Sequence, residues 1–493
     1  MTMRAQHNTQ CNSSGTPRRA FLMIFLVLFA IVGAGMGWVA DAGHAHAQPQ
    51  SRSQARQNAV AQDNGHVTII VLDMSGSMAT NDPNGIRCSA ADAYIDLSGI
   101  GSYIGVIGLD NNSGARGGPH NFQTAMPWAE PSEMATVPQH HALEAAIASK
   151  SNNCAPDSNT PTYDALNQAL TMLESATHNS QLSGSVILLT DGQPAPDGPQ
   201  QISAIQSDLV PQFRQHNWPV DAIALGTQAD FRFLATIANA TSGKFYDDAQ
   251  GVVQNGASGS PLNIAPFFVD IFAQRNRRTP GPTVPPTSLN GASTSREFQV
   301  GSYVDKLDVV AIKDQPGTQI TLTAPNGQTI TPITDGAYVA LDPYQHYVVY
   351  TINGPQQGYW TFTITGSGSF LMDSLITSSL KVNVLSPASD GTAQALGQDF
   401  TVKATVEDTT RGTQLTGSSD YTVKAIISFA GELPFGAANI PQIVQLSDAA
   451  SSGTYQGKVN IPQTARPGSY EIAVAVYGVT NVIITHTPRF IRL

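Results

Sequence analysis

Three oxygen-bearing side chains at the end of an apolar run are the part of this sequence best suited to chemistry. Asp73, Ser75 and Ser77 follow the stretch VTIIVL at residues 67–72, with one residue between each of them. A short run of β-branched and apolar residues predicts a strand buried on both faces of a parallel sheet. Open α/β sheets carry their ligand sites at the carboxyl ends of such strands. The pattern therefore predicts a ligand site here, and simple capping by Asp and Ser is the alternative.

The segment around this motif alternates between strand and helix patterns. Short apolar runs predict central strands, and periods near 3.6 predict helices between them. The strands are expected at residues 103–109, 185–190 and 220–226, and the helices at residues 162–177 and 261–274. Such alternation predicts an α/β fold, in which a doubly wound and mostly parallel sheet is covered by helices on both faces.

Two later segments complete a recognisable set. Thr160 precedes a predicted helix in SNTPTYDAL, and Asp191 follows the predicted strand SVILLT. Together with the Asp-x-Ser-x-Ser motif, they resemble the metal-ion-dependent adhesion site (MIDAS) of the von Willebrand factor type A (vWA) domain family, over residues 67–277. The resemblance implies a Rossmann-like domain that binds Mg²⁺, with Mn²⁺ or Ca²⁺ as further candidates. Its implied metal site comprises Asp73, Ser75, Ser77, Thr160 and Asp191.

The oxygen atoms of this residue set suit a hard cation. Mg²⁺ is a hard cation that prefers six oxygen ligands. The resemblance implies direct ligation by the Ser and Thr hydroxyls, and action of the two Asp carboxylates largely through water or hydrogen bonds. Neutral hydroxyls leave most of the metal charge uncompensated, so an Asp or Glu carboxylate of a partner protein is expected at the open position. We expect Gly76 to permit the tight turn between the serines, and helix capping is the alternative role for Thr160.

The resemblance to the vWA metal site predicts a binding protein and not an enzyme. The sequence lacks the Gly-x-Ser-x-Gly pattern of a nucleophile elbow. HHALE at residues 140–144 lacks the His-Glu-x-x-His spacing of zinc proteases and is expected to be a solvent-facing helix start. The alternatives are a structural cell-surface spacer with a non-functional metal site, and a metal-dependent hydrolase subunit, which lacks a candidate base.

The amino terminus has the pattern of an export signal. Arg18 and Arg19 precede a long apolar stretch, and the small residues of AHA at 45–47 fit a cleavage site. We expect a signal peptide at residues 1–47, with the twin-arginine type as a candidate, and a flexible leader at residues 48–64. The product would be secreted, periplasmic or held at the cell surface. An uncleaved anchor is the alternative, and it would be the only contact with a membrane.

The cysteines fit an oxidising compartment. Removal of the signal takes Cys11 with it and leaves Cys88 and Cys154. Within the vWA resemblance, Cys88 follows the serine loop and Cys154 lies just before Thr160. We therefore hypothesise a disulfide that joins two loops of the site, and two unpaired buried thiols are the alternative.

The remainder of the chain has strand patterns of period two. We expect a vWA domain at residues 65–278, a Pro-rich linker at 279–295, a β-sandwich at 296–378 and an immunoglobulin-like β-sandwich at 379–493. This part resembles the sandwich regions of calcium-activated chloride channel regulators and exported bacterial vWA proteins. Asn326-Gly327 is expected to form a hairpin turn, and Trp360 to lie in a core. The net charge of −11 argues against nucleic acid as a partner.

Overall fold

The structure is a computed structural model of the chain. It describes residues 62–110, 114–151, 154–155, 159–178, 182–226, 229–248, 261–342, 345–387, 395–417, 421–429, 442–465, 467–478, 482–485 and 489–492. The predicted signal peptide and most of the predicted leader lie outside these residues. Among the described residues, no helix has both the length and the apolar character needed to cross a membrane.

The first part of the described chain is an α/β domain, as predicted. Its central strands are β1 (Gln62–Asp73), β2 (Ile100–Leu109), β5 (Met126–Glu133), β6 (Ser183–Thr190), β7 (Val220–Ala224) and β8 (Phe245–Asp247). The helices are α2 (Met78–Asn81), α3 (Ile86–Leu97), α4 (Val137–Lys150), α5 (Thr162–Thr177), α6 (Gly198–Ala204), α7 (Val210–His216), α8 (Phe231–Ala240) and α9 (Pro261–Arg275), with a π-helical segment at Ile205–Leu209. A small hairpin pairs β3 (Arg116–Gly117) with β4 (Phe122–Gln123).

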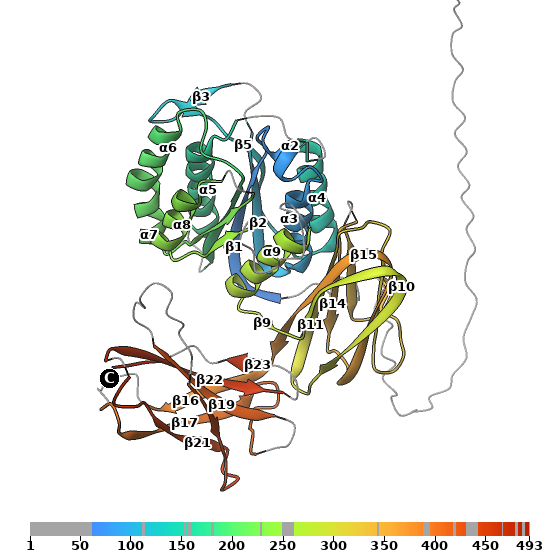
Figure 1. Cartoon of the computed structure of the whole chain (residues 1–493), viewed down its shortest axis with the longest axis vertical. Coiled ribbons are helices and arrows are strands. Elements are labelled where there is room, and N and C mark those ends of the chain that lie inside the picture. Colours follow the sequence, from blue (N-terminus) through green and yellow to red (C-terminus); the bar gives the residue numbers. More distant parts are fainter. Residues whose placement is uncertain are drawn as a thin grey trace, which may run out of the picture. The chain divides into compact units, whose positions relative to one another are not determined.

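The central sheet has the strand order β5-β2-β1-β6-β7-β8. Its strands are parallel except β5, which runs antiparallel to β2. Alternate residues of β1 enter two separate cores, with Ile70 and Leu72 on the face of α3 and α9, and Ile69 and Val71 on the face of α5 and α8. Figure 1 shows these helices on the two faces of the sheet. The doubly wound arrangement places the ends of β1 and β6 side by side.

Residues 279–378 form a curved antiparallel sheet. Its strands are β9 (Thr279–Pro280), β10 (Val284–Val300), β11 (Val304–Lys313), β12 (Gln319–Thr323), β13 (Ala337–Leu341), β14 (Tyr347–Asn353) and β15 (Gly358–Ser378). The long β15 pairs with β10 and β12 in its first half and with β10, β11 and β9 in its second. The core inside the curve contains Trp360, which is 1% exposed, as predicted. The predicted turn is also present, because the Gly327 amide donates to the Ala324 carbonyl and Gly327 has a φ of 83°.

The Pro-rich segment differs from its prediction as a linker. Residues 284–300 form β10, which pairs with β15 along most of its length. Proline is tolerated at a strand start and at irregular positions, and the β10–β15 register shifts between Val284 and Thr287, where the prolines lie. Helices α3 and α9 also share one apolar core with β11, β13, β14 and β15. The α/β domain and the first β region are therefore packed together, with no free spacer between them.

The last part of the chain forms two sheets with a common core. One sheet contains β16 (Leu380–Ser386), β17 (Asp399–Asp408), β18 (Thr413–Gln414) and β21 (Thr454–Asn460). The other contains β19 (Thr422–Phe429), β20 (Gln442–Leu446), β22 (Ser469–Tyr477), β23 (Val482–Thr485) and β24 (Arg489–Arg492). Apolar residues from both sheets, such as Val402 and Val474, lie in one cluster. This arrangement is an all-β sandwich.

Candidate functional site

The ends of two neighbouring strands bring the predicted acidic residues together. Leu72 of β1 lies beside Leu189 of β6 in the parallel register. Because both strands run in the same direction, Asp73 and Asp191 leave the sheet at the same edge. Both carboxylates are buried. This is the edge at which an open α/β sheet binds its ligands.

The two serines of the loop after β1 converge on Asp191. The Ser77 hydroxyl donates a hydrogen bond of 2.7 Å to Oδ1 of Asp191. The Ser75 hydroxyl lies 3.3 Å from the same oxygen and 2.9 Å from the hydroxyl of Ser77. The two serine hydroxyls and one carboxylate oxygen of Asp191 therefore lie close together at the end of the sheet.

Asp73, at the end of β1, holds this loop by hydrogen bonds. Its carboxylate accepts a hydrogen bond of 2.7 Å from the backbone amide of Ser75 and another from the Thr190 hydroxyl. Burial, followed by the charge of nearby Asp191, raises the pKa of Asp73 to about 6. A cation between these two buried carboxylates would reduce the repulsion between their charges.

Thr160 approaches the same region through its backbone. Its amide donates to the Ala195 carbonyl and its carbonyl accepts from the Ala195 amide, four residues after Asp191. The Thr160 hydroxyl has no hydrogen-bond partner among the described residues. The capping alternative is wrong, because the residue at the N-cap of α5 is Pro161, and the side chain that accepts from the first turn of α5 is Gln201, at the Tyr163 amide. The structure therefore joins four of the five predicted residues by hydrogen bonds and leaves the Thr160 hydroxyl available as a ligand.

Two further residues belong to the site and were missed in the sequence. The Asn81 amide donates a hydrogen bond of 2.9 Å to Oδ2 of Asp191, and Thr190 contacts Asp73. Asn81 lies four residues after Ser77 and so one helical turn away, which is the signal that could have revealed it. Gly226 makes room for it, since an added Cβ would lie 2.7 Å from Oδ1 of Asn81.

The expected role of Gly76 is wrong. Its φ is not among the positive values that favour glycine, and an added Cβ would meet no atom within 4 Å. The loop is turned instead by its hydrogen bonds to Asp73 and by the start of α2. A side chain at residue 76 is therefore compatible with this backbone.

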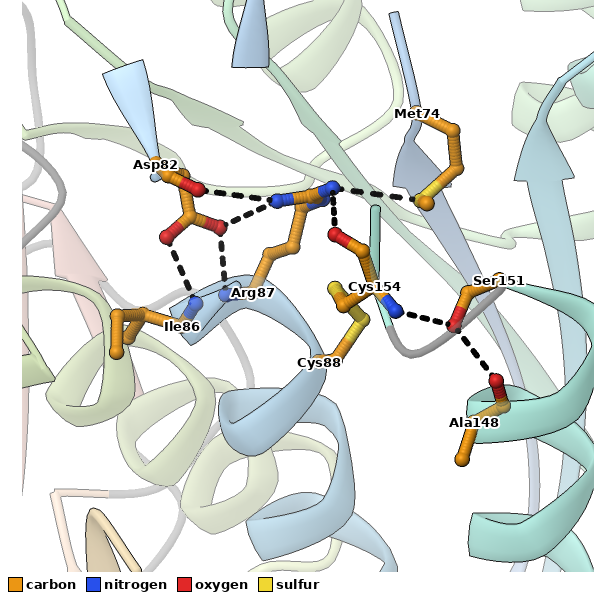
Figure 2. The surroundings of a disulfide bond; sticks show 8 residues. All are labelled: Met74, Asp82, Ile86, Arg87, Cys88, Ala148, Ser151 and Cys154. Carbon is orange, nitrogen blue, oxygen red and sulfur yellow. Dashed lines mark hydrogen bonds and ion pairs between the residues drawn. A yellow bond between two sulfur atoms is a disulfide. The ribbon is translucent and has the colours of Figure 1, made fainter. Parts of the chain in front are cut away.

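Cys88 and Cys154 are joined as a disulfide at the side of the site (Figure 2). Cys88 lies in the first turn of α3, and Cys154 lies in the segment that leads to Thr160. The bond links the helix after the serine loop to the segment before the threonine loop. Gly85 passes close to it, because an added Cβ there would lie 3.0 Å from Cβ of Cys154.

A buried ion pair reinforces the same junction. The Arg87 guanidinium lies 2.7 Å from Oδ2 of Asp82 and donates to the Cys154 carbonyl at 2.9 Å. Both side chains of the pair are fully buried. Asp82 also accepts hydrogen bonds from the first amides of α3, from Ile86 and Arg87. Figure 2 shows Arg87 between Asp82 and Cys154.

The HHALE segment is only partly as expected. It lies in α4, but His140 is fully buried and Glu144 is half-buried. Asp96 of α3, beside them, accepts hydrogen bonds of 2.7 Å and 2.8 Å from the hydroxyls of Tyr338 and Tyr347. The prediction of a solvent-facing helix is confirmed for His141 and Ala142, which are exposed. It is wrong for His140, because the first β region covers this face of α3 and α4.

Comparisons with known proteins give only distant likenesses. No family model matches the sequence, and no curated protein matches it. A solved von Willebrand factor type A protein from Catenulispora acidiphila is 14% identical, with a TM-score of 0.32, over 71% of this chain and 64% of its own. The ArnB paralog VWA2 from Sulfolobus acidocaldarius is 13% identical, with a TM-score of 0.29, over 72% and 64%. The pilus adhesin SpaC from Lactobacillus rhamnosus GG is 13% identical, with a TM-score of 0.35, over 85% and 54%. The chain thus spans about two thirds or less of the length of each of these structures.

Proposed function

We propose that this chain is an exported vWA-type protein that binds a divalent cation, with Mg²⁺ as the first candidate, and through it an acidic partner protein. The observation that supports the proposal is the convergence of Ser75 and Ser77 on one oxygen of Asp191. Strands β1 and β6, on which this convergence depends, are neighbours in the central sheet.

The donor set suits a hard cation. Ser75, Ser77 and Thr160 would supply neutral oxygens, while Asp73 and Asp191 would hold water or the hydroxyls in place. Among the described residues, no group of three or more His, Cys, Asp or Glu side chains forms a metal site. The proposed site therefore depends on hydroxyl ligands.

The same donor set explains why the partner should be acidic. Neutral first ligands leave the cation with most of its charge, and a carboxylate that completes its coordination gains a strong interaction. The two carboxylates of the site, Asp73 and Asp191, accept hydrogen bonds from neighbouring side chains and backbone, so we propose binding and no catalysis. Export, with Cys88 and Cys154 oxidised, would place this site outside the reducing cytoplasm.

Calorimetric titration of Mg²⁺ and Mn²⁺ into the full chain tests the metal site. The full chain is needed because α3 and α9 share their core with the first β region. We expect saturable binding at one site, and its loss in the double variant Ser75→Ala/Ser77→Ala. Ser203→Ala is the matched control, because Ser203 is exposed on α6.

The partner class is tested in a second step with immobilised peptides. Peptides that contain a single Glu or Asp should bind the chain with Mg²⁺ present and dissociate with a chelator. Their Gln or Asn counterparts should not bind. Metal binding that survives the double serine substitution would refute the assigned site, and peptide binding that survives chelation would refute the metal bridge.

A further inference from the structure

A cavity of about 540 Å³ lies beside α9, where the α/β domain meets the first β region. It shares no residue with the proposed metal site. Its volume is within the range of pockets for small organic ligands. The walls come from β8, α9, the start of β10 and β15, and the apolar part of the lining includes Tyr246, Phe267, Val284, Pro285 and Leu371.

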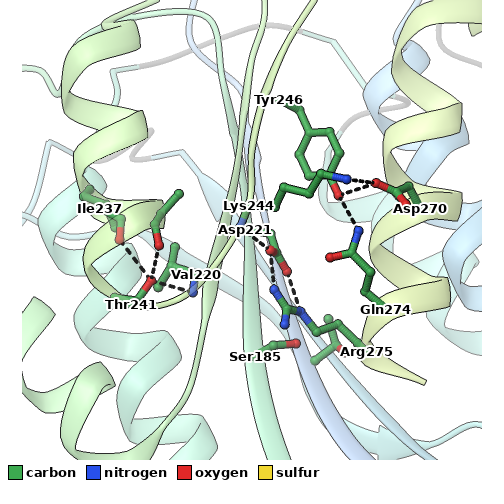
Figure 3. A network of polar contacts seen from close by, with 12 residues as sticks. Ser185, Val220, Asp221, Ile237, Thr241, Lys244, Tyr246, Asp270, Gln274 and Arg275 are labelled. Carbon is green, nitrogen blue, oxygen red and sulfur yellow. Dashed lines mark hydrogen bonds and ion pairs between the residues drawn. The ribbon is translucent and has the colours of Figure 1, made fainter. Parts of the chain in front are cut away.

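The cavity is lined by more acidic than basic side chains. Lys244, Asp247, Asp270 and Asp373 line it, while the segment from β10 contributes no ionisable side chain. Lys244 is already engaged, because its ammonium lies 2.5 Å from Oδ2 of Asp270. The Tyr246 hydroxyl donates to the same oxygen at 2.8 Å, as Figure 3 shows. The Lys244 ammonium therefore pairs with Asp270, and no ion pair joins it to Asp373.

Asp373 is the group that points to a ligand. It lies on β15, where its backbone pairs with β11, and its carboxylate lines the cavity without a hydrogen bond or ion pair to any residue that the structure describes. Burial, followed by the charge of Asp270, raises the pKa of this carboxyl to about 6. A carboxylate in an apolar cavity without a partner is costly, and an entering cation would remove that cost.

We propose that this cavity binds an organic cation, in which an apolar or aromatic body carries a primary ammonium or a guanidinium. The cationic group would pair with Asp373, and the body would lie against Tyr246, Phe267 and the proline rings. Aromatic faces also favour cations, and Lys244 already lies 5.0 Å from the centre of the Tyr246 ring. An anionic ligand of the same shape would meet an excess of carboxylates and is excluded by this charge balance.

Tryptamine and indole-3-propionate are matched probes for this proposal, since they share an indole body and differ in the sign of their charge. Titration into the full chain should give saturable tryptamine binding and none for the propionate. The affinity for tryptamine should fall at least tenfold in Asp373→Asn and stay unchanged in Asp335→Asn, an exposed carboxylate of a loop. The peptide acetyl-Phe-Lys-Phe-amide tests whether a lysine side chain of a polypeptide satisfies the same site.

A pH series separates this pairing from a structural effect of Asp373. Tryptamine stays protonated from pH 5 to 7, so its affinity should rise over this range as Asp373 loses its proton, with proton release to the buffer near pH 6. Equal tryptamine binding by Asp373→Asn, binding of the propionate as tight as that of tryptamine, or no tryptamine binding at millimolar concentration would each overturn the proposal. Calorimetry with Mg²⁺ in the same samples keeps this result separate from the fate of the metal site.

Discussion

At the scale of single residues, Thr160 gives the sharpest test of the metal site. Its hydroxyl has no partner among the described residues, and its contacts with Ala195 are made by the backbone. Thr160→Val keeps the shape of the side chain and removes only the oxygen. We expect Mg²⁺ affinity to fall about tenfold or more, which corresponds to about 1.4 kcal/mol, while the thermal midpoint stays nearly constant. Calorimetry and thermal unfolding measure the two effects, and a large drop in the midpoint with unchanged affinity would show a purely structural residue.

Glu144 makes a separate prediction about pH. Burial, followed by the charges of Asp96 and Asp92, raises the pKa of Glu144 to about 10. Its Oε1 has no hydrogen-bond partner among the described residues. The folded state therefore keeps a proton that the unfolded state releases near pH 4.5. The contribution of Glu144 to the free energy of unfolding is then fully present below pH 4.5 and is lost as the pH rises toward 10. The loss is at most about 1.4 kcal/mol per pH unit.

Glu144→Gln should remove this pH dependence. We expect the variant to gain about 1 kcal/mol or more over the parent chain at pH 9, or a few degrees in the thermal midpoint, with a smaller gain at pH 6. Glu130→Gln, on an exposed part of β5, is the matched control. Parallel stability curves for the parent and Glu144→Gln between pH 6 and 9 would contradict the raised pKa.

At the scale of elements, the disulfide fixes the loops that carry the site. It closes a loop with a sequence separation of 66 residues, for which the chain-entropy model gives roughly 4 kcal/mol. Cys88→Ser/Cys154→Ser should lower the thermal midpoint and weaken Mg²⁺ binding, because the segment before Thr160 would lose its covalent link to α3. Mass analysis of unreduced peptides should find the two cysteines linked. Two free thiols would show that Arg87 and Asp82 hold this junction without the covalent bond.

The elements also show what the sequence can and cannot reveal. The helix predicted at residues 162–177 has those bounds in the structure, because its apolar spacing is a local signal. The strand ends at Asp73 and Asp191 could be placed for the same reason. The strand at 284–300 could not, since its prolines indicate a linker and its pairing with β15 is a long-range contact. The burial of His140 likewise depends on β13 and β14, which lie about 200 residues further along the chain.

Across the molecule, the α/β domain and the first β region share one apolar core, so the boundary between them is not a hinge. Apolar residues of α3 and α9 pack with those of β11 and β14 in one cluster. A movement of α9 on partner binding would therefore act on the β sheet directly, without a linker as intermediary. The second β region has a core of its own.

This division predicts how the chain unfolds. The α/β domain and residues 279–378 should melt in one calorimetric transition, and the last sandwich in another. Tyr347→Phe removes a hydrogen bond to the buried Asp96 carboxylate and should cost about 1.5–3 kcal/mol. Only the first transition should move, while Tyr359→Phe, in which the parent side chain is 60% exposed, should move neither. Separate melting of the α/β domain and the first β region, with Tyr347→Phe affecting only one of them, would show that their shared core does not couple them.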